Sequence, residues 1–146
     1  MKWIVWIWVL LLGISSASAE TVYASRTTQV FASPGEATLG RIYAGTRLDA
    51  DSEQNGFRQV RFAGLNGYVE ADAVSGAQGQ IDIHMAKVVS PYGTETVVLR
   101  SSPSNSYKTV SIIQAGASVQ TLGVFNGFVL VRIGDVSGFL SKNEIE

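Results

Sequence analysis

FNGFVLVRIGDVSGFLSKNEI, residues 125–145, has the pattern of a β-hairpin followed by a closing strand. Asn126-Gly127 forms a turn dipeptide, because both residue types tolerate positive φ. The next segment, Phe128–Ile133, is rich in β-branched and aromatic residues, which favour strands. Gly134-Asp135 supplies a second turn before Gly138-Phe139-Leu140. These 21 residues therefore predict two antiparallel strands, each preceded by a tight turn.

The same pattern lies upstream in QNGFRQVRFAGLNGYVEADAV, residues 54–74. Asn55-Gly56-Phe57 matches Asn126-Gly127-Phe128, and Gly67-Tyr68-Val69 matches Gly138-Phe139-Leu140, each 71 positions apart (126 − 55 and 138 − 67). A constant spacing over roughly thirty residues without a gap indicates an internal duplication. We interpret the chain as two copies of one small β unit.

The N-terminal segment predicts a cleaved signal peptide over residues 1–19. Lys2 precedes an apolar run of 11 residues, 4–14, and Ala17-Ser18-Ala19 has the small-x-small pattern of a cleavage site. The run is shorter than the ~20 apolar residues of a spanning helix. We therefore expect export, to the periplasm or beyond, without membrane insertion after cleavage.

The remaining chain divides into a first unit over residues 20–75, a linker over 76–86 and a second unit over 87–146. Short strand-like segments alternate with turn signals every 6–12 residues, as in all-β barrels and sandwiches. A single 3₁₀ turn is the most helix expected, near residues 69–74. Residues 75–80, SGAQGQ, are small and polar, as linkers are.

The net charge argues against one class of partner, and the lack of cysteine limits how the units can be stabilised. Without Lys2 the chain keeps 10 basic residues against 12 acidic ones, a net charge of −2. This balance gives no electrostatic footprint for nucleic acid. The chain has no cysteine, so apolar packing alone must hold units that are near the size limit for one core.

The second unit resembles the bacterial SH3-like (SH3b) domain, and the first unit resembles a more diverged copy. The matching motifs are LRSSPS (99–104), SYK (106–108), AGASV (115–119), NGF with VRI (126–133) and SGFL (137–140). The resemblance implies two tandem small barrels. It also implies binding rather than chemistry, since exported SH3b domains commonly target peptidoglycan or envelope proteins. Phe57 and Phe128 stand where the family usually has Trp, which removes an indole N–H donor.

Aromatic side chains beside loops are the candidate ligand-binding residues. Alternation places Val129, Val131 and Ile133 on the buried face of their strand, and leaves Phe128 on the more open face. Phe62, Tyr68 and Phe139 are expected in the core. Arg58, Arg61, Arg100 and Arg132 are expected to flank a groove or to form a solvated face. The candidate binding residues are Phe57, Phe128, Tyr92, Tyr107 and Phe125; their alternative role is simply to cover a small barrel.

No catalytic, metal or cofactor site is predicted. The single histidine, His84, lies in the predicted linker without a nucleophile motif, and Asp49, Asp51 and Glu53 lack the spacing of a calcium loop. Two non-enzymatic functions remain open. The first is an exported module that recognises peptidoglycan or an envelope protein through aromatic grooves. The second is a periplasmic structural or regulatory subunit that acts through protein–protein contacts.

Overall fold

The computed structural model describes residues 19–146, so residues 1–18, which carry almost all of the predicted signal peptide, lie outside the described part. The helices in this part are two 3₁₀ turns, Ala71–Ala73 (η2) and Lys142–Glu144 (η3). No helix within residues 19–146 has the length and apolar character needed to cross a membrane. The all-β fold class is confirmed, and η2 falls where a 3₁₀ turn was expected.

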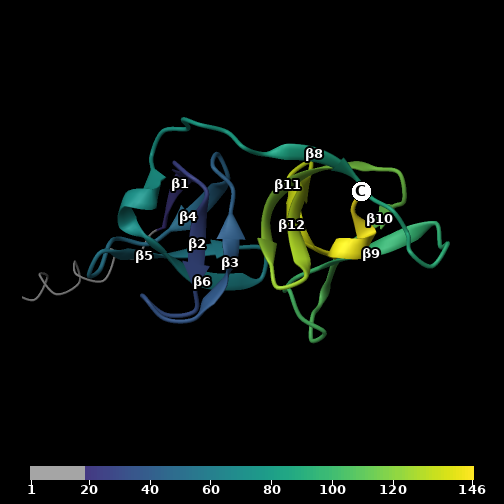
Figure 1. Cartoon of the computed structure of the whole chain (residues 1–146), viewed down its shortest axis with the longest axis horizontal. Coiled ribbons are helices and arrows are strands. Elements are labelled where there is room, and N and C mark those ends of the chain that lie inside the picture. Colours follow the sequence, from purple (N-terminus) through teal and green to yellow (C-terminus); the bar gives the residue numbers. More distant parts are fainter. Residues whose placement is uncertain (1–18) are drawn as a thin grey trace, which may run out of the picture.

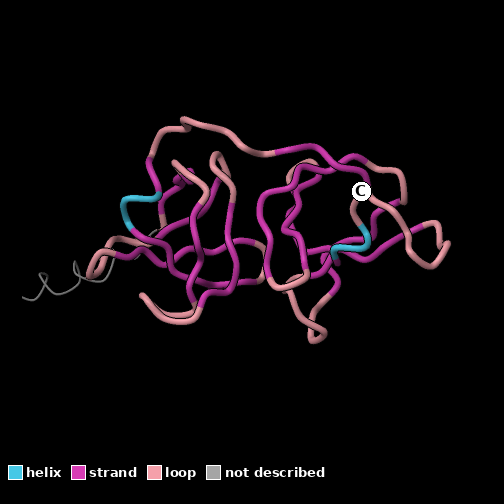
Figure 2. Tube along the Cα trace, in the orientation of Figure 1, coloured by secondary structure: helices cyan, strands magenta, loops and turns pink. Residues whose placement is uncertain are grey.

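Thirteen strands form the fold, and we divide them into a first half (residues 20–75) and a second half (residues 84–146). The first half contains β1 (Glu20–Ala24), β2 (Thr28–Phe31), β3 (Thr38–Ile42), β4 (Arg47–Ala50), β5 (Phe57–Phe62), β6 (Leu65–Glu70) and β7 (Val74–Ser75). The second contains β8 (His84–Lys87), β9 (Thr96–Arg100), β10 (Thr109–Gln114), β11 (Ser118–Phe125), β12 (Phe128–Ile133) and β13 (Val136–Ser141). The two halves lie side by side, and the connecting segment 76–83 runs along one side of both (Figure 1, Figure 2).

Equivalent hairpins occur in both halves. β5 and β6 pair along their whole length, as do β12 and β13, whose bounds lie 71 positions later. The turns before β5 and β12 use Asn55 (φ 55°) with Gly56 (φ 84°) and Asn126 (φ 46°) with Gly127 (φ 87°). Two successive residues with positive φ match the twist of the flanking strands. The Asn-Gly turns predicted from the sequence are confirmed.

The connecting segment is shorter than expected. Residues 84–86 fall within the predicted linker, but they belong to β8, which pairs with β11 from Ser118↔Lys87 to Thr121↔His84. The Thr121 hydroxyl also donates a hydrogen bond to the His84 carbonyl oxygen (3.0 Å). The eight-residue strand β11 offers a free edge there. Pairing with β11 gives residues 84–87 the structure of a strand, although their own residue types favour a strand only weakly.

Hydrogen bonding joins the two halves into one sheet. The strand order is β10-β9-β13-β12-β11-β3-β2-β6-β5-β4-β1-β7, with β8 also paired to β11. At the joint Ile42 pairs with Gly123 and Arg41 with Val124, and the Tyr43 amide donates to the Leu122 carbonyl oxygen (2.8 Å). A Cβ on Gly123 would overlap the Arg41 carbonyl oxygen. The finer prediction of two tandem SH3-like barrels stays a prediction, because the halves share this sheet.

Two clusters of buried side chains support the sheet. One cluster lies within the second half and is built on Val88, Val97, Leu99, Ile113, Val119, Val129, Val131 and Leu140. The other contains the core of the first half together with Leu122, Phe125, Leu130 and Phe139 of the second. A core that takes residues from both halves makes their separation costly, because separation would expose these apolar side chains to water.

Candidate functional site

The site is built on the outer faces of β5 and β12, by which we mean the faces turned away from each half's own core. Phe57, Gln59 and Arg61 lie on the outer face of β5, and all three are half-buried. Phe128, Leu130 and Arg132 lie on the outer face of β12. The two faces come from matching positions in the sequence, but their surroundings differ.

In the first half the outer face forms a groove, here called the Phe57 groove. Its volume is about 190 Å³. Phe57, Gln59 and Tyr68 come from β5 and β6, where Gln59 lies directly opposite Tyr68. The remaining lining residues lie in loops: Pro34, Asp51, Ser52, Gln54 and Asn55. The β hairpin therefore supplies an aromatic floor, and two loops supply a mostly polar wall.

A ring contact and two hydrogen bonds hold the aromatic floor of the groove in place. The rings of Phe31 and Phe57 meet edge to face, with centroids 5.9 Å apart and an interplanar angle of 87°, a favourable arrangement for aromatic pairs. The Arg58 guanidinium donates to the Asp51 carbonyl oxygen (2.6 Å) and to the Glu20 carboxylate (2.6 Å). These contacts fix the loop that carries Asp51 against the strand that carries Phe57.

Tyr68 differs from its predicted place. The sequence analysis placed it in the core, but it is half-buried and lines the groove. The matching residue Phe139 is fully buried, as predicted. Both side chains lie on outer faces, and only that of Phe139 is covered by the other half.

An ion pair between Arg61 and Asp51 stabilises one wall of the groove. Arg61 donates two hydrogen bonds to the Asp51 carboxylate, at 2.9 and 3.2 Å. Because these bonds favour the ionised carboxylate, the pKa of Asp51 lies below its usual range. Asp51 therefore presents a negative charge to the groove at any pH near neutrality.

We expect the Arg61→Gln variant to show a higher midpoint for the Asp51 titration than the parent protein, because the guanidinium that stabilises the carboxylate is lost. A group whose pKa is lowered by folding stabilises the fold above its unfolded pKa. That contribution is lost as the pH falls through the folded pKa. The parent should therefore lose more stability on acidification than the variant. Carboxyl ¹³C NMR titration measures the midpoint, and an unchanged midpoint in the variant would contradict the role given to Arg61.

In the second half the outer face around Leu130 is covered by the first half. Leu130 is 0% exposed and belongs to the core cluster shared by both halves, and Phe128 packs against the same cluster. On the first half's side of this contact, the Gly64 amide donates to the Ser101 carbonyl oxygen (2.9 Å). Phe128 stays half-buried, as Phe57 does, but it packs against the shared core, and the turn between β5 and β6 lies against the second half.

Phe125 is buried rather than lining a groove, so its assignment as a binding residue is wrong. Its side chain is 0% exposed, and its ring contacts those of Phe62 and Phe139, with both centroid distances 5.4 Å. Phe125 ends β11, immediately before a turn, which is why its position in the sequence suggested a loop-side residue. The turn is exposed, but the Phe125 side chain is directed into the joint between the halves.

Arg100 connects Phe128, Tyr107 and Glu144 in a compact cluster. The Arg100 guanidinium carbon lies 5.1 Å from the Tyr107 ring centroid and 5.8 Å from that of Phe128. It also pairs with Glu144 at 2.7 Å, and Glu144 is only 7% exposed. Burial disfavours the guanidinium charge, but the interactions with Glu144 and Tyr107 together outweigh burial and raise the pKa of Arg100. Two of the aromatic side chains predicted for binding in this half, Tyr107 and Phe128, thus contact Arg100.

The sequence analysis did not identify Glu144. A local signal exists, because Ser141 precedes Glu144 by three residues, and the Glu144 carboxylate accepts a hydrogen bond from the Ser141 amide (2.8 Å). This is the spacing of a helix-capping box. It predicts a local role for Glu144, whereas the pairing with Arg100 spans 44 positions and required the fold.

The structure does not bring the five predicted aromatic residues together. Phe57 lines a groove, Phe128 and Tyr107 contact Arg100, and Phe125 lies in the core. Tyr92 is 83% exposed in the turn before β9 and is not among the residues that line the Phe57 groove. Of these five residues, Phe57 is the one that lines a hollow described here.

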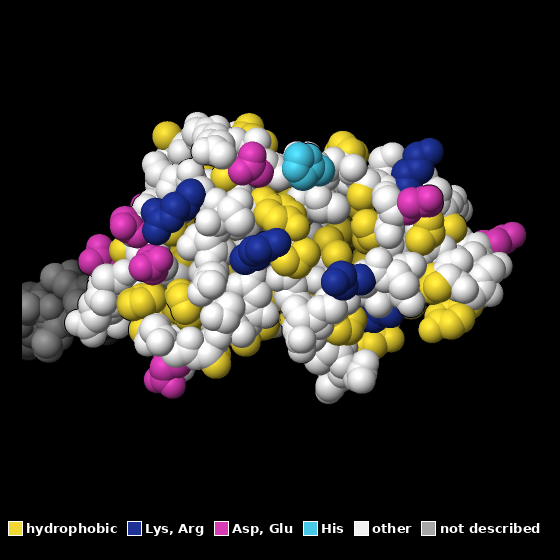
Figure 3. All heavy atoms as spheres, viewed as in Figure 1, with side chains coloured by type: hydrophobic (Ala, Val, Ile, Leu, Met, Phe, Trp, Pro, Cys, Tyr) yellow, Lys and Arg dark blue, Asp and Glu magenta, His cyan; other side chains and the backbone are white. Residues whose placement is uncertain are grey.

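The part of the chain described by the structure contains no group of three or more His, Cys, Asp or Glu side chains placed to hold a metal ion. His84 is exposed on β8. Figure 3 shows basic and acidic side chains scattered over one face, with hydrophobic side chains between them. On that face, recognition of a charged ligand therefore depends on local groups of side chains.

Comparisons with known proteins do not assign this chain to a family. No protein-family model matches it, and no curated protein does. Among solved structures, NlpC1 from Trichomonas vaginalis is similar over 90% of this chain and 47% of its own length, at 16% identity and a TM-score of 0.42. NlpC2 from the same organism is similar over 88% of this chain and 48% of its own, at 14% identity and a TM-score of 0.41. The chain spans about half the length of each of these proteins, and the assignment of the candidate site rests on geometry.

Proposed function

We propose that this protein is an exported, non-catalytic binding module of the cell envelope that recognises peptidoglycan through the Phe57 groove. One observation carries the proposal. Of two matching outer faces, the first half's is hollowed and lined by aromatic and polar side chains, while in the second half Leu130 and Phe128 pack against the core shared by both halves. The signal-peptide pattern and the SH3b resemblance in the sequence support the envelope location.

The chemistry of the groove suits a short segment of mixed polarity. Phe57 and Tyr68 offer ring faces for apolar contact, and Gln54 and Gln59 offer amide donors and acceptors. Asp51 accepts hydrogen bonds from ammonium or amide groups while Arg61 holds it in place. At about 190 Å³ the groove is smaller than the ~300 Å³ at the low end of small-molecule pockets. It therefore accommodates one residue or sugar of an extended ligand.

A second candidate function, a structural or regulatory subunit that binds an envelope protein, is favoured by β10. This strand ends the sheet, and its Val110 and Ile112 side chains are 41% and 64% exposed. An edge strand with exposed apolar side chains can pair with a strand of another protein. The two candidates use different surfaces, so one set of variants can separate them.

The test is co-sedimentation of residues 20–146 with purified peptidoglycan sacculi, comparing the parent with Phe57→Ala. We expect the parent to sediment with sacculi and the variant to bind up to about tenfold more weakly, because it loses an aromatic contact worth about 0.5–1.5 kcal/mol. Tyr92→Ala is the matched control, since Tyr92 is an exposed aromatic residue outside the groove. It should bind as the parent does.

Two results would overturn the wall-binding proposal. One is a parent protein that stays in the supernatant, which would direct attention to β10 and a protein partner. The other is equal weakening by Phe57→Ala and Tyr92→Ala, which would show nonspecific adhesion. Circular dichroism of each variant establishes that its fold is intact, because Phe57 also contacts Phe31.

A further inference from the structure

A second hollow lies between the two halves and is separate from the Phe57 groove. Its volume is about 290 Å³, and its lining includes Tyr23 and Arg47 from the first half and Gln120, Arg132 and Ser137 from the second. A neighbouring hollow of about 460 Å³ shares Arg47, Asp135 and Ser137 with it. Neither half could form this cleft alone, because its walls come from β1 and β4 on one side and from β11, β12 and β13 on the other.

The walls of the cleft are fixed by contacts between the halves. The Thr46 hydroxyl donates to the Leu122 carbonyl oxygen (3.1 Å), and both residues are buried. From the connecting segment, the Gln78 amide donates to the Gly45 carbonyl oxygen (3.1 Å). Leu122, Gly45 and Gln78 themselves line the cleft. The cleft is therefore preformed, which lowers the entropic cost of binding.

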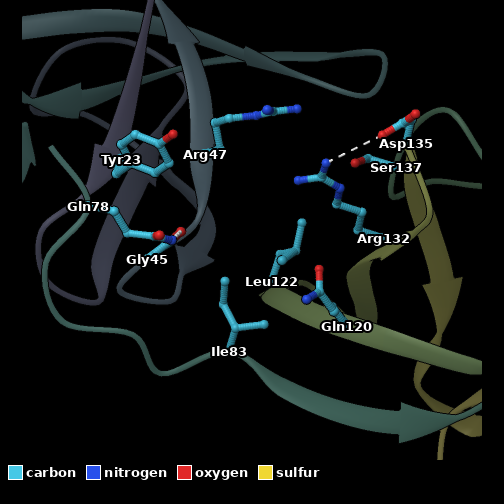
Figure 4. A pocket seen from close by; sticks show the side chains of 10 residues that line it. All are labelled: Tyr23, Gly45, Arg47, Gln78, Ile83, Gln120, Leu122, Arg132, Asp135 and Ser137. Carbon is cyan, nitrogen blue, oxygen red and sulfur yellow. Dashed lines mark hydrogen bonds and ion pairs between the residues drawn. The ribbon is translucent and has the colours of Figure 1, made fainter. Parts of the chain in front are cut away.

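Two guanidinium groups enter the cleft from opposite sides. Figure 4 shows Arg47 of the first half and Arg132 of the second reaching into the same space. Among the described residues, no carboxylate lies within ion-pairing distance of Arg47. Arg132 donates through Nε to the Gly134 carbonyl oxygen (2.9 Å), a contact that orients its side chain.

The acidic side chains near the cleft do not neutralise this pair. Asp135 lies 3.8 Å from Arg132, but its side chain is fully exposed, and an exposed pair of this length contributes little. Asp49 is two residues from Arg47 on β4 and lines only the neighbouring hollow. The cleft thus contains two cations and one solvated anion. Two like charges that face one space favour an anion between them.

We propose that the cleft between the halves binds an anion, a carboxylate or phosphate group, between Arg47 and Arg132. Planar guanidinium groups pair with both kinds of oxyanion through two parallel hydrogen bonds. The hydroxyl groups of Tyr23 and Ser137 and the amide of Gln120 supply further donors in the cleft. Such a site needs the fixed orientation of the halves, because residues of both halves line it. The proposal does not depend on the function proposed for the Phe57 groove.

The test is NMR titration of residues 20–146 with inorganic phosphate and, separately, with citrate, each compared with sodium chloride at equal ionic strength. We expect saturable shifts of the Arg47 and Arg132 Nε–Hε signals. Saturation by citrate alone assigns a carboxylate ligand, and saturation by phosphate alone assigns a phosphate ligand; saturation by both assigns an oxyanion site of either kind. Saturation by neither probe, or equal shifts with chloride, overturns the proposal.

Single substitutions test whether the anion binds in the cleft. Arg47→Gln should weaken binding about tenfold, as loss of a charged hydrogen-bonding partner does. Arg41→Gln is the matched control, because Arg41 is an exposed arginine on β3 that does not line the cleft. Equal weakening by both variants would show a general charge effect and overturn the proposal. Phe57→Ala should bind the anion as the parent does, so failure of this proposal and failure of wall binding are distinguishable.

Discussion

Replacing Phe125 with alanine is expected to lower the free energy of unfolding by about 3–5 kcal/mol, the usual cost of truncating a buried phenylalanine. The side chain is 0% exposed and packs against the rings of Phe62 and Phe139. It also packs against Gly40 of β3, where a Cβ would overlap the Phe125 ring. The surrounding backbone belongs to the paired strands β3 and β11, so it can collapse into the cavity only in part.

Urea unfolding followed by circular dichroism measures this loss, because all three tryptophans lie within residues 1–8 and the expected mature chain has no tryptophan signal. Tyr92→Ala is the control and should change the unfolding free energy by less than about 0.5 kcal/mol, as exposed substitutions do. Hydrogen exchange adds a further check, since loss of a shared core should raise exchange rates in both halves. A Phe125→Ala protein as stable as the Tyr92→Ala control would contradict the shared core.

Replacing Glu144 with glutamine is expected to lower the free energy of unfolding by about 3 kcal/mol. Removing one charge of a buried ion pair costs about 3–5 kcal/mol, because the other charge stays buried without its partner. The lower end of that range applies because the Arg100 side chain is 15% exposed. The aromatic rings of Tyr107 and Phe128 also remain beside the guanidinium. Glutamine keeps the side-chain volume, so the measurement isolates the charge.

Asp135→Asn is the matched control, because it removes the charge of a fully exposed partner 3.8 Å from Arg132. Its expected effect is below about 0.5 kcal/mol. Combining Glu144→Gln with Arg100→Met removes both charges, and we expect the double variant to be more stable than Glu144→Gln alone. A Glu144→Gln protein no less stable than Asp135→Asn would show that the Arg100–Glu144 pair contributes nothing to stability.

Local signals in the sequence were sufficient for much of the fold. β12 has the residues predicted for it, and the Asn-Gly turns and the 3₁₀ turn η2 lie where the sequence places them. These features depend on residues close together in the chain: φ preferences in turns, and two-residue alternation in strands. For the same reason the alternation of β12 correctly assigned Val129 and Val131 to the core of their own half.

The candidate site depended on contacts that no local pattern encodes. Alternation assigns Phe57 and Phe128 to outer faces, but it does not say what packs on those faces. The fold leaves Phe57 beside a groove and places Phe128 against the shared core. Likewise, the position of Phe125 before a turn suggested exposure, whereas the pairing of β3 with β11 buries it.

The sequence by itself therefore determined the strands, the tight turns and the all-β class, because these follow from backbone preferences within a few residues. Only the tertiary structure decided which outer face stays open, which aromatic residue is buried, and that Arg47 and Arg132 face one cleft. Those outcomes depend on the joint between the halves. At that joint, Gly123 has no side chain and so lets the backbones of β3 and β11 approach closely. Apolar side chains of both halves are buried there in one shared core.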